Sequence, residues 1–109
     1  MKACSFTLEY YISESGRIPF KAWLDGLKDI HARAKIRISL DRVRLGNFGH
    51  AKSVGEGVHE LKIDYGPGYR VYYAFAGNTI VLLLLGGAKA SQSKDIACAK
   101  EYWKAFKRR

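Results

Sequence analysis

Cysteine is scarce in this chain of 109 residues, and neither of its two cysteines suggests a metal or redox site. Cys4 and Cys98 lie far apart and match no zinc or redox spacing, so we interpret both as buried, reduced thiols. No cluster of cysteine, histidine and glutamate has metal-ligand spacing, and the glycine-rich segments match neither a P-loop nor a dinucleotide fingerprint. The sequence therefore predicts no metal and no cofactor.

Long apolar runs are also lacking. The longest, Thr79 to Leu85, is much too short to span a bilayer as a helix. The N-terminus, Met1-Lys2-Ala3-Cys4, leads directly into an amphipathic strand and has no apolar stretch followed by a small-residue cleavage site. We therefore expect a cytoplasmic protein with no signal peptide and no membrane association.

Acidic residues are few, 10 against 19 lysines and arginines, which gives a net charge of +9. Solubility alone can explain a basic surface, but so large an imbalance in a small chain favours binding to a polyanion. RNA, DNA and an acidic protein segment all fit, and charge does not choose among them. The hydrophobic share of 48% is typical of a globular protein, and the length suits a single domain over residues 1–109.

Hydrophobic periodicity predicts seven elements in the order β-α-α-β-β-β-α. Pro19 suits the first turn of a short helix, and Asp29 suits the N-cap of a longer one that ends before Gly46. The glycine-dotted stretch from Gly46 to Gly57 is predicted to be a loop. The predicted strands are 6–12, 58–63, 69–76 and 79–85; the predicted helices are 19–24, about 30–45, and one that follows a polar linker at 89–93.

This order predicts an α+β fold in which a helical hairpin joins the first strand to a small antiparallel sheet and packs on it. The last strand, Ile80 to Leu85, shows no polar alternation, so both of its faces should be buried in the middle of the sheet.

The second helix has two apolar sides. The wider side carries residues 32, 36, 40 and 43, while Ala34, Ile38 and Leu45 form a narrower stripe on the opposite side. The second stripe is covered either by the first helix or by a partner protein. Basic residues fill the remaining surface of this helix.

Alternation along two neighbouring strands places basic residues side by side. Lys62, Arg70 and Tyr72 are predicted to share the sheet face that points away from the helical hairpin. Two cations on adjacent strands repel each other unless something anionic lies between them. An RNA phosphate and a salt bridge of Arg70 with Glu60 or Asp64 explain this arrangement equally well.

Such a face suits RNA scission by the substrate's own 2′-hydroxyl. That reaction needs a group that removes a proton, fixed positive charge at the phosphorane, and a group that protonates the leaving 5′-oxygen. Arginine suits the second task, because its guanidinium stays charged and binds two phosphate oxygens. A lysine or a histidine can serve as the base or acid. We interpret His31 and His50 as bystanders and His59 as partly buried on the opposite face.

The run from His59 to Tyr73, HELKIDYGPGYRVYY, resembles the central signature of RelE/ParE-superfamily toxins, and its Gly-Tyr-Arg-Val-Tyr core is the most specific part. An apolar strand that ends in Gly86-Gly87, a polar linker and a terminal helix with Ala, Trp and Lys are similar to the HigB-like branch, the phage-derived addiction module killer proteins. The early FKAWL helix and the basic second helix are also similar to that branch, so the resemblance covers nearly the whole chain.

The resemblance implies a RelE/ParE-like fold and the toxin of a type II toxin–antitoxin system. Many relatives cut mRNA at the ribosome, and the implied partner is a cognate antitoxin, which in this branch usually carries a helix-turn-helix domain. By position, Arg70 corresponds to the phosphate-binding arginine, and Lys62 to the basic residue that helps to activate the attacking hydroxyl. Lys89 corresponds to the cation after the last strand.

The C-terminal helix departs from the pattern of RelE itself, which has a base-stacking tyrosine at the start of this helix. Lys94 lies in that region here, so either another residue, with Tyr72 as the candidate, positions the base or the ribonuclease activity is weak. Lys94, Arg108 and Arg109 are further candidate RNA contacts of this helix.

Two other functions fit the same resemblance. A ParE-like toxin poisons DNA gyrase without chemistry of its own and shares the fold. An inactive homologue that only binds an antitoxin also fits. The Lys62 and Arg70 pair favours the ribonuclease.

Overall fold

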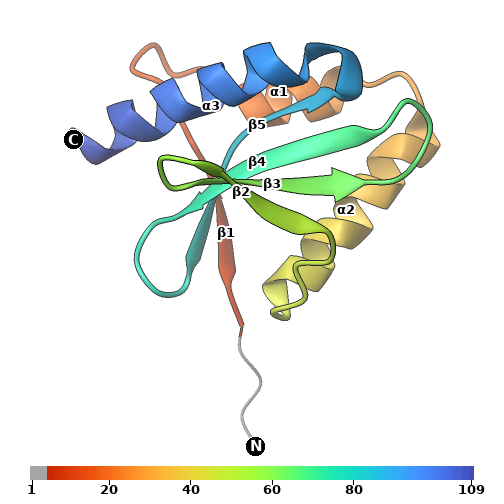
Figure 1. Cartoon of the computed structure of the whole chain (residues 1–109), viewed down its shortest axis with the longest axis horizontal. Coiled ribbons are helices and arrows are strands. Elements are labelled where there is room, and N and C mark those ends of the chain that lie inside the picture. The colour runs from red at the N-terminus through yellow and green to blue at the C-terminus, as the bar shows by residue number, and fades with distance from the viewer. Residues whose placement is uncertain (1–4) are drawn as a thin grey trace, which may run out of the picture.

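The computed structural model describes residues 5–109, so Cys4 lies outside the described part. In this part, five strands and three α-helices form an α+β fold with one sheet between helices (Figure 1). The strands are β1 (Thr7–Tyr10), β2 (Ala51–Gly55), β3 (Val58–Ile63), β4 (Tyr69–Phe75) and β5 (Ile80–Ala88). The helices are α1 (Pro19–Gly26), α2 (Ile30–Arg44) and α3 (Gln92–Lys107), the last preceded by a short 3₁₀ turn, Lys89–Ser91.

The ends of the helical hairpin follow from local sequence signals. Pro19 is the first residue of α1, where its missing N–H costs no hydrogen bond. The carboxylate of Asp29 caps α2 by accepting from the backbone N–H groups of His31 at 2.9 Å and Ala32 at 3.2 Å. At the other end, Gly46 takes a positive φ of 87° and donates its N–H to the carbonyl of Val43. Both boundaries of α2 agree with the prediction.

The sheet has the strand order β1-β5-β4-β3-β2. Strands β2 to β5 pair antiparallel, but β1 runs parallel to β5, so the prediction of an entirely antiparallel sheet is wrong. Side-chain alternation is the same in both kinds of pairing, so it does not encode strand direction. Strand β5 lies between β1 and β4 with most of its side chains buried, as predicted.

The edge strand β2 lies within the segment that was predicted to be a loop. It pairs with β3, with Lys52 opposite Glu60 and Ser53 opposite His59. The turn between the two strands contains residues 55–57, all with positive φ. Because this stretch is short, polar and rich in glycine, its own pattern is that of a loop, and pairing with β3 makes it a strand.

Each face of the sheet has its own core. On one face Val71 packs with Ile36 of α2, in a cluster that includes the buried side chains of both hairpin helices. On the other face Leu84 packs with Ala99 of α3. This arrangement confirms the predicted division of β3 and β4 into a face toward the hairpin and a face away from it.

Two glycines at the end of β5 allow helices to approach both faces closely. A Cβ on Gly86 would overlap the ring of Trp23 in α1, and a Cβ on Gly87 would overlap the carboxylate of Asp95 in α3. Glycine therefore replaces the larger side chains of β5 at the two positions where α1 and α3 pack closest to the strand.

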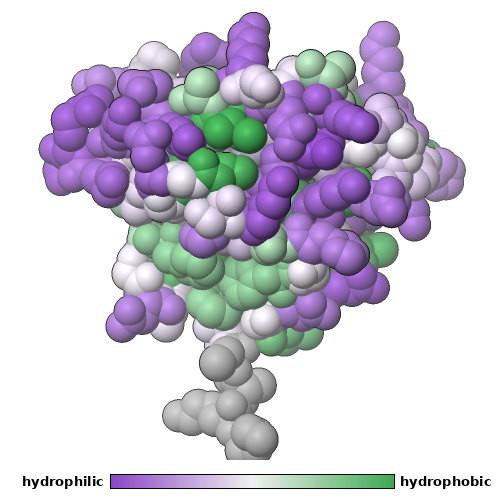
Figure 2. Space-filling view, in the orientation of Figure 1, coloured by the Kyte–Doolittle hydropathy of each residue, from purple (hydrophilic) through white to green (hydrophobic). Residues whose placement is uncertain are grey.

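Hydrophilic side chains cover much of the upper part of the face shown in Figure 2, and hydrophobic ones gather toward its lower part. No helix within residues 5–109 is long and apolar enough to cross a membrane.

Candidate functional site

Arg70 has an unusual environment for a basic residue. Among the lysines and arginines of residues 5–109, it alone is buried, with 7% of its surface exposed. It lies on β4 directly opposite Lys62 of β3, and Lys62 is exposed. Because burial of a cation is costly unless an opposite charge compensates it, the surroundings of Arg70 define the site.

The compensating group is the carboxylate of Glu60, which is only 3% exposed. Its Oε2 lies 3.7 Å from Nε of Arg70 and accepts hydrogen bonds from the Tyr72 hydroxyl at 3.2 Å and from Nε2 of Gln92 at 2.8 Å. Its Oε1 lies 3.9 Å from Nζ of Lys52. The structure therefore contains the salt bridge of Arg70 with Glu60 that was one of the two sequence-based explanations.

Hydrogen bonds satisfy the guanidinium only in part, and its Nε is buried. Nη1 donates to the carbonyl of Gly68 at 3.3 Å, while Nε has no hydrogen-bond partner within residues 5–109. The Glu60 contact is thus an ion pair rather than the bidentate bond that arginine can form with a carboxylate. Arg70 is held at both ends of its guanidinium and still borders open space.

That space is a pocket of about 400 Å³, which we call the cationic pocket. Its lining consists of His50, Ala51, Lys52, Glu60, Lys62, Asp64 and Arg70. Three of these side chains are basic, two lysines and one arginine, and one is an imidazole. With two carboxylates also present, the pocket offers a cationic surface together with groups that can move protons.

His50 is a pocket residue that the sequence interpretation missed. Its carbonyl accepts the N–H of Lys62 at 3.1 Å, and this bond continues the pairing of β2 with β3. The imidazole therefore lies beside Lys62 even though twelve positions separate the two in the chain. No sequence signal marked it, because the segment around it was interpreted as a loop.

Lys89 lies close to Arg70 through the β3–β4 turn. The backbone N–H of Lys89 donates to the carbonyl of Gly68 at 2.9 Å, the same carbonyl that Arg70 contacts. Lys89 is exposed in the turn before α3, and Lys94 is exposed in the first turns of that helix. The structure thus brings Lys62, Arg70 and Lys89 to adjacent positions at one end of the sheet.

The remaining predicted RNA contacts lie elsewhere. Tyr72 is fully buried, and burial together with the Glu60 carboxylate raises its pKa. Its ring has no free face for a base, so the structure gives it the role of a core residue that orients Glu60. Arg108 and Arg109 follow the far end of α3, about 21 Å from Lys94 at 1.5 Å per residue. Arg109 donates to the carbonyl of Ile12 at 2.6 Å.

His59 packs on the opposite face of β3, as predicted. Its ring stacks on Tyr73 with 5.3 Å between ring centroids, and burial lowers the pKa of its imidazole.

Cys98 is half-buried in α3 and carries a free thiol. Residues 5–109 contain no group of three or more histidine, cysteine, aspartate or glutamate side chains that could hold a metal ion.

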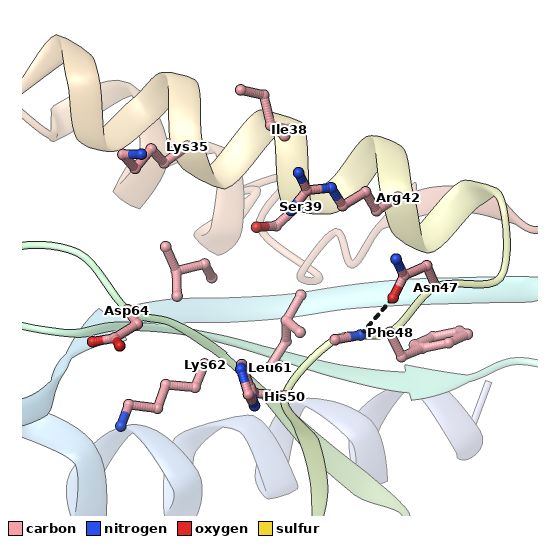
Figure 3. A pocket seen from close by; sticks show the side chains of 12 residues that line it. Lys35, Ile38, Ser39, Arg42, Asn47, Phe48, His50, Leu61, Lys62 and Asp64 are labelled. Atoms are coloured by element: carbon pink, nitrogen blue, oxygen red, sulfur yellow. Dashed lines mark hydrogen bonds between the residues drawn. The ribbon is translucent and has the colours of Figure 1, made fainter.

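A second depression adjoins the cationic pocket, and we call it the α2 groove. Its volume is about 370 Å³, and it is lined by Lys35, Ile38, Ser39, Arg42, Asn47, Phe48, Gly49, His50, Leu61, Lys62, Ile63 and Asp64. Figure 3 shows residues of α2 on one side of it, residues of β3 on the other, and the segment after α2 closing one end. His50, Lys62 and Asp64 belong to both depressions, so the two are continuous.

The cationic pocket combines three basic side chains with two carboxylates. Cations on three neighbouring strands converge on it, one of them held rigidly by a buried carboxylate, and rigid donors bind a charge without reorganisation. Fold and pocket together define a class, a small basic α+β protein with a cation-lined pocket at one end of its sheet.

The chain belongs to the family described as Phage derived protein Gp49-like, whose model matches residues 22–107. This is a toxin-like family of addiction modules. An uncharacterized protein from Haemophilus influenzae (strain ATCC 51907 / DSM 11121 / KW20 / Rd) is similar, with 48% identity over 83 residues, 76% of this chain and 84% of that protein. The matched family segment includes every residue of both depressions.

Proposed function

We propose that this chain is the toxin of a type II toxin–antitoxin system and a HigB-like member of the RelE/ParE superfamily. Its proposed activity is cleavage of mRNA at the ribosome, and its proposed partner is an antitoxin with a helix-turn-helix domain. The toxin-like family supports the first part of this proposal. The lining of the cationic pocket supports the ribonuclease.

The observation that carries the proposed activity is the burial of Arg70 beside the pocket. The only buried cation among residues 5–109 is held between Glu60 and the carbonyl of Gly68, next to Lys62 and His50. A structural cation needs no such opening to solvent. A guanidinium that must receive the developing negative charge of a phosphorane needs both the opening and the rigid support.

In the proposed reaction the 2′-oxygen of the RNA attacks the adjacent phosphorus, and the bond from phosphorus to the 5′-oxygen breaks. Arg70 binds the phosphate oxygens and stabilises the phosphorane. Lys62 activates the attacking hydroxyl, whose proton passes to His50, since an imidazole accepts and donates protons near neutral pH. Lys89 donates a proton to the leaving 5′-oxygen. The products are a 2′,3′-cyclic phosphate and a free 5′-hydroxyl.

The exposed cations outside the pocket extend this interface. Lys94 lies in the first turns of α3, near Lys89, and contacts the RNA backbone on that side. Arg108 and Arg109 lie too far along α3 to reach the same phosphate, so they contact a more distant part of the RNA. Such contacts contribute affinity rather than catalysis.

The test maps new 5′ ends on a reporter mRNA after induction of the wild-type chain, of Arg70→Lys and of Arg70→Ala. Loss of one rigid phosphate cation should lower the cleavage rate by roughly 10²–10³-fold. Arg70→Lys keeps the charge beside Glu60 and loses the guanidinium fork, so it should fold normally and cleave slowly. Arg17→Ala removes an exposed arginine outside the pocket and should cleave like the wild type.

Three other results would count against the proposal. Growth arrest without new 5′ ends would favour the gyrase-directed toxin, and damage to DNA that depends on gyrase would establish it. No arrest from a well-expressed wild-type chain would favour the inactive homologue. Full cleavage by a folded Arg70→Ala variant would remove Arg70 from the reaction.

A further inference from the structure

We propose that the outer side of α2 is the docking surface for an acidic, amphipathic segment of the neutralising partner, and that an apolar side chain of this segment fills the α2 groove. The proposal rests on the proposed function in one respect, the existence of a protein that neutralises this chain. The location and chemistry of the contact come from α2 itself.

Large hydrophobic side chains are exposed along α2. Ile30, Ile38 and Leu45 have exposed fractions of 62%, 50% and 72%. At 100° per residue, these residues and Ala34 fall within about 80° of the helix circumference, so they form one stripe, which Asp41 interrupts between Ile38 and Leu45. Helix α1 does not cover this stripe, which removes one of the two explanations offered by the sequence. An exposed apolar stripe of this length on a small protein indicates a contact with another molecule.

Basic residues border the stripe on both sides. Lys35 and Arg42 lie along one edge, and Arg33, Arg37 and Arg44 lie along the other, from their positions around the helix. Arg44 pairs with Asp41, an acidic residue on the stripe itself. Within residues 5–109 the other four cations form no ion pair.

Charge complementarity therefore sets the chemistry of the partner. It needs an apolar stripe to cover Ile30, Ile38 and Leu45, and carboxylates along both edges to compensate the cations that α2 leaves unpaired. An amphipathic helix with acidic residues flanking its apolar face has this pattern.

The α2 groove gives the contact a fixed point. Ile38, Phe48, Leu61 and Ile63 supply its apolar lining among polar neighbours, so a leucine or aromatic side chain from the partner finds apolar contacts there (Figure 3). Buried anchors of this kind dominate binding energies. Because the groove shares His50 and Lys62 with the cationic pocket, its occupant also blocks access of RNA to that pocket.

Other occupants fit this surface less well. The arginines along the edges of the stripe suit RNA phosphates, but an RNA would leave Ile30, Ile38 and Leu45 without an apolar partner, since its bases stack on aromatic or guanidinium planes. A second copy of this chain docked on the stripe would place its own α2 cations against the α2 cations of the first copy, and like charges repel. A membrane-bound amphipathic helix buries a broader apolar face with large side chains than this narrow stripe offers.

The experiment begins with the neutralising protein, selected from a genomic library of the source organism by restored growth of cells that express the wild-type chain. Its affinity is then measured by calorimetry for the wild type, for Ile38→Asp with Leu45→Asp, and for Ile12→Asp. Ile12 is a matched control, since it is 47% exposed and lies after β1, outside the stripe. Circular dichroism confirms that each variant is folded.

The stripe variant should bind about 30-fold or more weakly, as expected for the loss of buried anchors, and Ile12→Asp should bind like the wild type. In cells the stripe variant should still arrest growth but escape neutralisation. The affinity of the wild type should fall with added salt, and Lys35→Glu with Arg42→Glu should reduce that dependence.

Equal neutralisation of the stripe variant and the wild type would overturn this docking surface and leave the proposed function intact. If the stripe variant were neutralised normally but lost binding to RNA or to anionic vesicles, this docking surface would be overturned as well. The ligand that was lost would then be the true occupant of the stripe. A wild-type chain that never arrests growth would instead overturn the proposed function, and the neutralising partner with it.

Discussion

At the scale of single residues, the side chain of Arg70 connects the fold with the proposed chemistry. Its charge is compensated by one buried carboxylate, and that carboxylate is itself held by Tyr72 and Gln92. Gln92 begins α3, so the C-terminal helix takes part in positioning a residue of β4. The cluster also explains why Tyr72 is buried, since its hydroxyl finds its acceptor inside the molecule.

Replacement of Glu60 by glutamine tests the strength of this pair. Glu60→Gln keeps the shape of the side chain but leaves the buried Arg70 cation without an opposite charge, which should lower the free energy of unfolding by about 3 kcal/mol. Urea denaturation measures the change. Glu9→Gln makes the same substitution at an exposed position of β1 and should have little effect.

A second variant separates charge from packing. Glu60→Gln combined with Arg70→Gln removes both charges and should recover part of the lost stability, since the cost lies in an unpaired buried charge. If the single variant were as stable as the wild type, Arg70 would be compensated by solvent instead of by Glu60.

At the scale of elements, β5 and α2 each carry apolar side chains on two opposite sides. Strand β5 places leucines in both cores and then ends in Gly86 and Gly87, which allow Trp23 and Asp95 to approach from opposite faces. Helix α2 buries one side against the sheet and exposes a second apolar side. The Gly86-Gly87 pair of β5 meets residues of distant segments, Trp23 and Asp95, whereas no segment within residues 5–109 covers the second apolar side of α2.

Gly86→Ala should destabilise the protein strongly. The new Cβ would overlap the Trp23 ring, and relief of such overpacking requires movement of α1, at a cost of about 2–3 kcal/mol. Thermal denaturation measures the loss. Gly26→Ala is the matched control, because a Cβ there meets no atom within 4 Å, and it should leave stability unchanged or slightly raised.

Addition of Trp23→Ala to the Gly86→Ala variant should relieve the overlap and make the cost of the alanine small. A Gly86→Ala protein as stable as the wild type would mean that α1 does not press on β5 as described.

At the scale of the whole molecule, stability should depend on pH in two stages. Burial holds the pKa of His59 below its ordinary value of 6.5, so the unfolded chain takes up a proton at higher pH than the folded one. Stability is then full above pH 6.5 and decreases as the pH falls below it. Backbone hydrogen bonds in the first turn of α2 lower the pKa of Asp29, and Lys100 and Lys104 lower the pKa of Glu56, so the contribution of these carboxylates is lost only at more acidic pH.

His59→Phe should remove the first stage and keep the second. Urea denaturation between pH 7.5 and about 3, where carboxylates titrate, would measure the two stages. Phenylalanine suits the site, because the His59 ring already packs against Tyr73 and Phe75. If His59→Phe lost stability below pH 6.5 as the wild type does, the first stage would belong to another titratable group.

The sequence by itself determined the features that depend on neighbours along the chain. Caps at Asp29 and Gly46 mark the ends of α2, because capping is a contact between residues a few positions apart. Alternation assigned Lys62 and Arg70 to one face and His59 to the other, because successive side chains of a strand point to opposite sides.

Only the tertiary structure decided the features that depend on pairing between distant segments. Strand β2, the parallel direction of β1 and the place of His50 in the cationic pocket all come from pairings that no local pattern encodes. The choice of Glu60 as the partner of Arg70 depends on Gln92, which reaches the same carboxylate from 32 positions away. The sequence supplied the cations of the site, and the packing of α3 on the sheet decided which of them is buried and held.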